Sequence, residues 1–412
     1  MEEWKEYRAK DFCATVTDGT HDSPKPITTG HYLITSKHLK DNRIDFSSAN
    51  LISEEDYQKV ILRSAVEQYD ILFSMIGTIG NTVQVKQKHV DFAVKNMGIF
   101  KMGRNELKST WLYYWLNSGY SKNYINQRLA GSTQSYMTLD SLRCFPIMYP
   151  GDKNAQLIVS VLKSLDDKIE VNRRINENLE QQAQALFKSW FVDFEPFKDQ
   201  PFVESELGMI PKGWKIDNIY KYIDVVYGAP YKSALFNDEK NGMPLIRIRD
   251  LKTNSPQFYT SEILNTTEYI EAGDIVAGMD AEFTPYLWLG DKGVLNQRCC
   301  KFKGKDKWIS NYFILFFVKP KLEFVQSYKT GTTVSHLGKS DIDRFKFITP
   351  PLDVVRAFSK IVNPIKEDVV NRALESRRLA ELRDTLLPRL MSGELKVTDV
   401  DLVNKLTEDN II

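Results

Sequence analysis

The strongest constraint on the fold of this chain is an internal repeat, whose period is about half of the 412 residues. The matched segments are, in order, 32–40 with 244–252, 70–72 with 274–276, 94–101 with 294–301 and 131–135 with 331–335. Their order is the same in both halves, and their spacing changes only where a loop can change length. We therefore predict two copies of one structural unit.

Each half divides into a β-rich region and a long helix. Short apolar runs such as 71–76 and 313–318 are separated by Gly, Asn and Asp, a pattern typical of strands and turns. In residues 154–191 and 354–391 the apolar residues instead recur every three or four positions, which predicts helices. Pro364 should break or kink the first turns of the second helix. The expected segments are a globular domain at 1–150, a helix and linker at 151–205, a second globular domain at 206–350, and a helix with a tail at 351–412.

The apolar stripe of each helix has the spacing of a coiled-coil seam. Asn172 and Asn176 fall on the first stripe, where polar residues fix the register of pairing. We predict an α+β fold in which the two helices pair as an antiparallel coiled coil with pseudo-two-fold symmetry. The residues expected to pair are Leu165, Ile169, Leu179, Leu186, Ile365, Val369, Leu379 and Leu386. The alternative is two ordinary α+β domains, each packing its terminal helix on its own sheet.

The charge of the chain limits how it could bind a polyanion. With 55 Lys and Arg against 54 Asp and Glu, the net charge is +1, so any nucleic-acid site must be a local patch. The densest basic stretch spans 292–307 and supplies the candidates Arg298, Lys301 and Lys303. A solvated hairpin would explain the same stretch.

Two hydroxyl-rich loops occupy equivalent places in the repeat, at 131–136 and 331–336. Hydroxyl and backbone N–H groups in such loops bind phosphate oxygens and reach base edges, and nearby cations supply counter-charge. The candidates are Arg128, Ser132, Thr133, Gln134, Ser135 and Tyr136 in the first half, and Thr332, Thr333, Ser335, His336 and Lys339 in the second. Turns that close strand pairs are the alternative.

The sequence contains no complete catalytic motif. It has no GxGxxG fingerprint, no HExxH pattern and no Asn/Asp-Pro-Pro-aromatic loop of an amino-methyltransferase. The four cysteines and five histidines lack metal-ligand spacing, so we expect neither a zinc site nor a bound cofactor. These observations favour a binding protein. An autonomous nuclease with unrecognised carboxylates is the competing hypothesis.

Local sequence motifs resemble those of one family, the specificity subunits of type I restriction–modification systems. Asp18-Gly-Thr-His21 is similar to a frequent opening of that family's recognition domains, which makes His21 a candidate. Residues 187–197, followed by 205–214, resemble the family's passage from the central helix into its second recognition domain. The layout of two β-rich domains, each followed by a long helix, is also that family's and covers nearly the whole chain.

This resemblance implies that each globular domain reads one half of a split site in double-stranded DNA. The helices would dock two methyltransferase subunits, which carry S-adenosylmethionine, and motor-nuclease restriction subunits could join them. No catalysis would lie in this chain.

Two departures from the family pattern affect these expectations. The family usually has a polar pair at the start of each long helix, and Gln156 fits this pattern. Residues 353–355 instead read Asp-Val-Val, so docking of a methyltransferase subunit on the second helix could differ. Residues 227–230 read Tyr-Gly-Ala-Pro in place of Asp-Gly-Thr-His, which predicts an asymmetric site. The charged N-terminus and the short apolar runs predict a cytoplasmic protein without a membrane span.

Overall fold

The computed structural model describes residues 4–40, 42–130, 135–329 and 336–396. The chain divides into two compact units. Unit 1 comprises residues 1–167 and 379–412, and unit 2 comprises residues 168–378. The boundary runs through both long helices, so each unit contains a part of each helix.

Unit 1 is built around a four-stranded antiparallel sheet in the order β2-β10-β7-β8. The unit also contains a three-stranded sheet in the order β6-β3-β9, in which β3 and β9 are parallel. The strands are β2 (Thr15–Asp18), β3 (His31–Ile34), β6 (Asn50–Ile52), β7 (Ile71–Ser74), β8 (Thr82–Gln84), β9 (Phe92–Val94) and β10 (Met97–Lys101). In addition, β1 (Lys5–Arg8) pairs with β11 (Pro146–Tyr149), and β4 (Leu39–Lys40) pairs with β5 (Arg43–Ile44). Besides the long helices, the α-helices are α1 (Ala9–Phe12), α2 (Glu54–Ser64), α3 (Glu106–Leu116), α4 (Gly119–Gln127) and α5 (Leu139–Arg143).

Unit 2 repeats this plan. Its four-stranded sheet has the order β15-β23-β20-β21, and a second sheet has the order β16-β18-β17-β22-β19. The strands are β15 (Ile223–Tyr227), β16 (Phe236–Asn237), β17 (Met243–Ile246), β18 (Phe258–Thr260), β19 (Tyr269–Ile270), β20 (Ile275–Gly278), β21 (Pro285–Leu287), β22 (Gly293–Leu295) and β23 (Cys299–Gly304). In addition, β12 (Phe202–Ser205) pairs with β13 (Gly208–Pro211), and β14 (Lys215–Asn218) pairs with β24 (Lys346–Thr349). The helices are α7 (Ile248–Leu251), α8 (Asn311–Lys329) and α9 (Lys339–Asp343). The same strand order and the same parallel pair occur in both units, which supports the repeat predicted from the sequence.

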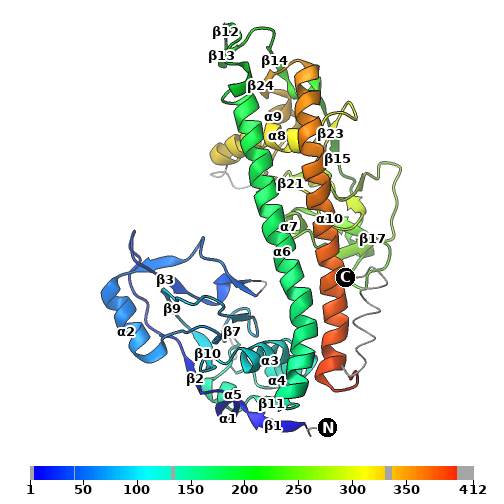
Figure 1. The fold of residues 1–412 in the computed structure, drawn as a ribbon. Helices are drawn as coiled ribbons and strands as arrows, with labels where there is room; N and C mark the ends of the chain where they lie inside the picture. Colours follow the sequence, from blue (N-terminus) through cyan, green and yellow to red (C-terminus); the bar gives the residue numbers. More distant parts are fainter. Residues whose placement is uncertain (1–3, 41, 131–134, 330–335, 397–412) are drawn as a thin grey trace. The chain divides into compact units, whose positions relative to one another are not determined.

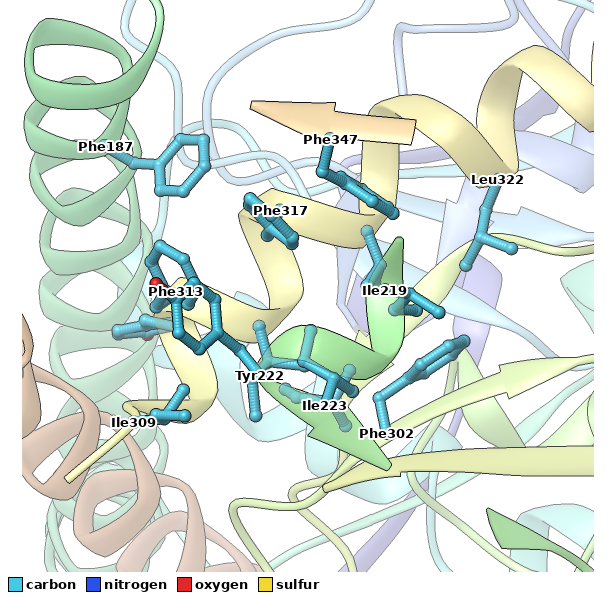
Figure 2. Packing of buried hydrophobic residues seen from close by; sticks show 14 of the residues in the cluster. Phe187, Ile219, Tyr222, Ile223, Phe302, Ile309, Phe313, Phe317, Leu322 and Phe347 are labelled. Carbon is cyan, nitrogen blue, oxygen red and sulfur yellow. The ribbon is translucent and has the colours of Figure 1, made fainter. Parts of the chain in front are cut away.

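The strand predicted at 313–318 is wrong, because these residues lie in helix α8. Phe313 and Phe317 are buried and contact Phe187 of α6 (Asp152–Phe191) and Phe347 of β24, respectively (Figure 2). The run is apolar because most sides of this helix are covered. A short apolar run does not distinguish a buried strand from a buried helix, since neither then needs a polar face.

The sequence alignment of the two halves is also out of register from β9 and β22 onward, because Val94 occupies the place of Leu295 and not of Val294. The N–H of Asn96 donates to Thr20 O, whereas the N–H of Gln297 donates to Ala229 O, so Gln297 and not Asn296 occupies the place of Asn96. Two residues separate β9 from β10, but three separate β22 from β23. Arg298 is the additional residue and has no counterpart in unit 1.

The long helices are α6 (Asp152–Phe191) and α10 (Leu352–Met391), with 40 residues each. The expected break at Pro364 does not occur. An internal proline costs about 3 kcal/mol, and buried Val362 and Val369 anchor the turns on either side of Pro364.

The two helices contact each other in both units, and they run antiparallel (Figure 1). In unit 2, Asn172 donates to Glu375 at 2.6 Å and Asn176 donates to Val369 O at 3.0 Å. In unit 1, Arg383 donates to Asp166 at 2.6 Å. Within the described ranges, no helix is long and apolar enough to span a membrane.

Candidate nucleic-acid interface

One end of the four-stranded sheet in unit 1 gathers polar side chains. Asp18 is the last residue of β2, and its Oδ2 lies 3.0 Å from Nε2 of His21. The Nδ1 of His21 lies 2.9 Å from Oδ1 of Asn96, just before β10. Arg63 of α2 donates to the other oxygen of Asp18. A side chain at Gly19 would place its Cβ 2.3 Å from Val94 O, so only glycine permits this approach of the backbone.

Tyr136, the last residue of the hydroxyl-rich loop of unit 1, lies at the same end of the sheet. Ser132, Thr133 and Gln134 lie outside the described residues. Ser135 and Tyr136 are exposed, and the backbone of Tyr136 forms bridges with Ala130 and with Ile76, which follows β7. Exposed Arg128 follows α4 with its guanidinium 5.2 Å from the ring centre of Tyr124.

Unit 2 has a different set of residues at the equivalent end. Tyr227 occupies the place of Asp18, since Tyr227 pairs with Cys300 as Asp18 pairs with Gly98. Its hydroxyl is buried without a hydrogen-bond partner, and burial raises the pKa of Tyr227 to about 12. Pro230 follows where unit 1 has His21, so this segment offers no charged group.

The charged group of unit 2 comes instead from Asp280, which follows β20. Its Oδ2 lies 3.3 Å from Nη1 of Arg298, and its Oδ1 lies 2.6 Å from Nδ1 of His336. The backbone of Asp280 bridges to His336, as Ile76 does to Tyr136 in unit 1. Thr332, Thr333 and Ser335 lie outside the described residues. The structure therefore brings together two of the candidate residues, Arg298 and His336, on a carboxylate that the sequence analysis did not single out.

The basic stretch at 292–307 is not a single surface. Lys301 is only 11% exposed, and it contacts Asp274 at 2.9 Å and Glu268 at 3.1 Å. In unit 1, Lys101 contacts the fully buried Asp70 at 2.7 Å in a similar way. We assign Lys301 to this structural ion pair and leave it out of the interface. Lys303 is exposed, and Lys339 contacts Asp343 at 2.8 Å.

The apolar stripe residues of the two helices are mostly buried by packing within each unit. Leu165, Val369, Leu379 and Leu386 are buried. Ile169 is half-buried, and the partly buried residues that pack on the core of unit 2 are Leu179, Leu186 and Ile365. A partner that docks on these helices would therefore contact their outer faces. In the part of the chain that the structure describes, no three His, Cys, Asp or Glu side chains are placed to hold a metal ion.

Comparison with known proteins places the chain in a family. The family model described as "Type I restriction modification DNA specificity domain" matches residues 1–181 and 211–381. The two matched regions cover most of the chain, and the chain belongs to this family.

Individual relatives agree with this assignment. The chain is 31% identical over 374 residues to the type I restriction enzyme MjaIX specificity subunit of Methanocaldococcus jannaschii, covering 83% of each protein. It is 24% identical to the HindI specificity subunit of Haemophilus influenzae, covering 96% of this chain and all of that one. A crystal structure of a type I system S subunit from M. genitalium covers 94% of this chain and 96% of its own, with a TM-score of 0.51 at 14% identity, and so shares the fold.

Proposed function

We propose that this chain is the DNA-sequence specificity subunit of a type I restriction–modification complex and that it works in the cytoplasm. Each β-rich domain would read one half of a split site in double-stranded DNA. One observation carries this proposal beyond family membership. The two units share a strand order, yet the equivalent sheet ends hold Asp18 and His21 in unit 1 and Asp280, Arg298 and His336 in unit 2. One scaffold with two sets of polar groups suits an asymmetric site.

The partners in this proposal are two methyltransferase subunits and the motor-nuclease restriction subunits. S-adenosylmethionine would be bound by the methyltransferase subunits. The outer faces of α6 and α10 offer exposed apolar residues for docking, namely Leu157, Val171 and Ile361. The nuclease alternative has no support from the relatives described above, which are specificity subunits.

Exchange of residues 206–350 for the second domain of another specificity subunit tests the proposal. Methylation of host DNA by the exchanged complex should change in one half-site and stay the same in the other. Alteration of both half-sites would contradict separable readers. The purified chain alone should neither methylate nor cleave DNA, and metal-dependent cleavage lost upon a point mutation within the chain would favour the nuclease hypothesis.

A further inference from the structure

Each unit holds an arginine and a histidine on the two oxygens of one aspartate. In unit 1, Oδ1 of Asp18 accepts from Arg63 and Oδ2 contacts His21 at 3.0 Å. In unit 2, Oδ2 of Asp280 contacts Arg298 at 3.3 Å and Oδ1 contacts His336 at 2.6 Å. We call these groups the Asp18 trio and the Asp280 trio.

The repeat does not explain this similarity, because the trios come from different positions. Asp18 ends β2, whereas Asp280 follows β20. Arg63 is on α2, a helix that unit 2 lacks at this place, and Arg298 is the additional residue between β22 and β23.

Both trios nevertheless lie at the same end of the equivalent sheets. This end is formed by the last residues of β2 and β7 and the start of β10, and in unit 2 by those of β15 and β20 and the start of β23. The same chemical group, built twice from different residues at the same place, indicates a shared task.

The two arginines themselves should contribute little to fold stability. The side chain of Arg63 is 61% exposed and that of Arg298 is 56% exposed. Charged groups this exposed gain little stability from an ion pair. The carboxylates are more shielded, at 7% for Asp18 and 26% for Asp280. A shielded carboxylate fixed by a histidine restrains the guanidinium while leaving its outer N–H groups open to solvent. Such pre-organisation lowers the entropy lost when the arginine binds a partner.

We infer that Arg63 and Arg298 each read a guanine, one in each half of the DNA site. Guanine presents two acceptors, O6 and N7, in the major groove, and the planar fork of arginine matches both. This inference rests on the proposed function and adds a chemical prediction to it: each half-site contains a required G·C pair. A phosphate contact is the other task open to an exposed arginine, and it would carry no base preference.

The test uses the full chain in complex with its methyltransferase subunits and a pool of duplexes with randomised positions. Selection by the wild-type complex should return at least one required G·C pair in each half-site. Arg63→Lys keeps the positive charge but removes the planar guanidinium with its two parallel donors. It should reduce the preference for the G·C pair in one half-site by roughly 5- to 100-fold. Arg298→Lys should do the same in the other half-site. Asp18→Asn and Asp280→Asn should weaken the same preferences, since they release the arginines.

In each variant, an unchanged base preference in the other half-site shows that the complex is folded and binds DNA. Arg104→Lys is the matched control, because Arg104 is 72% exposed and pairs with Glu67 beyond the other end of β10. A wild-type complex without sequence preference would refute the proposed function. A selective wild type with no G·C requirement in either half-site, or with preferences that the arginine variants leave intact, would refute this inference alone. Parallel weakening on all duplexes would also refute it and assign the arginines to phosphates.

Discussion

The fully buried side-chain amide of Asn172 on α6 donates a hydrogen bond to the Glu375 carboxylate on α10, at 2.6 Å. Arg372 donates in turn to Oδ1 of Asn172 at 3.3 Å. This polar layer interrupts a seam that is otherwise largely apolar, and its bonds form in only one register of the two antiparallel helices.

Asn172→Ala should lower the free energy of unfolding by about 1–3 kcal/mol, because it leaves Glu375 and Arg372 short of a partner inside the seam. Denaturant-induced unfolding measures the change. Asn178→Ala on the exposed face of α6 is the control and should have little effect. Equal stabilities of the two variants would mean that the polar layer does not contribute to pairing.

Leu379→Glu should destabilise unit 1 by at least about 3 kcal/mol and abolish co-purification with the methyltransferase subunits, since Leu379 is fully buried. Leu179→Glu should have a smaller effect because Leu179 is only partly buried. Val171→Glu, at a position 50% exposed on α6, should leave stability unchanged. Normal stability and co-purification of Leu379→Glu would argue against the helix pair as a structural element.

The stability of unit 1 should depend on pH through His31. Its Nε2 lies 2.5 Å from Glu54 Oε2, and its Nδ1 contacts Asp91, so the hydrogen bond to Glu54 and that to Asp91 raise the pKa of His31. A histidine whose pKa is raised by folding stabilises the folded state at low pH, and this stabilisation is lost as pH rises through the raised value.

His31→Gln should therefore lower the melting temperature more at about pH 5.5 than at about pH 9. The same substitution at exposed His89 is the control. A difference between wild type and His31→Gln that does not vary with pH would contradict a charged His31.

Lys301→Met should reduce stability by about 1–3 kcal/mol and leave base preference intact, because it removes the partner of Asp274 and Glu268. Lys303→Met, at an exposed position of the same strand, should leave stability unchanged. Duplex selection and thermal unfolding of both variants check this. A changed base preference in Lys301→Met would return Lys301 to the interface.

Arg128→Ala and Lys339→Ala should weaken binding of all duplexes about equally. Each should reduce the slope of log affinity against log salt concentration by about 1, as expected for the loss of one phosphate contact. Titration of a matched and a mismatched duplex at several salt concentrations measures both effects. A loss confined to the matched duplex would instead indicate a base contact.

The sequence by itself determined the repeat, the two long helices to within two residues at their starts, and the seam positions of Asn172 and Asn176. These features are periodic, and a period is visible without coordinates because it reflects which side of an element is covered. The Asp-Gly-Thr-His motif also made His21 a candidate, and the structure places this residue beside Asp18 at the end of β2.

Only the tertiary structure decided the rest. Residues 313–318 form a helix, and their apolar run could not separate this from a buried strand, since packing covers most sides of the helix. The placement of Lys301 in an ion pair and of Arg298 beside His336 depended on strand register, which one additional residue between β22 and β23 shifts. Arg63 joined Asp18 from 45 residues away in the chain. Contacts of this kind leave no local pattern, because they are set by how strands and helices meet in space.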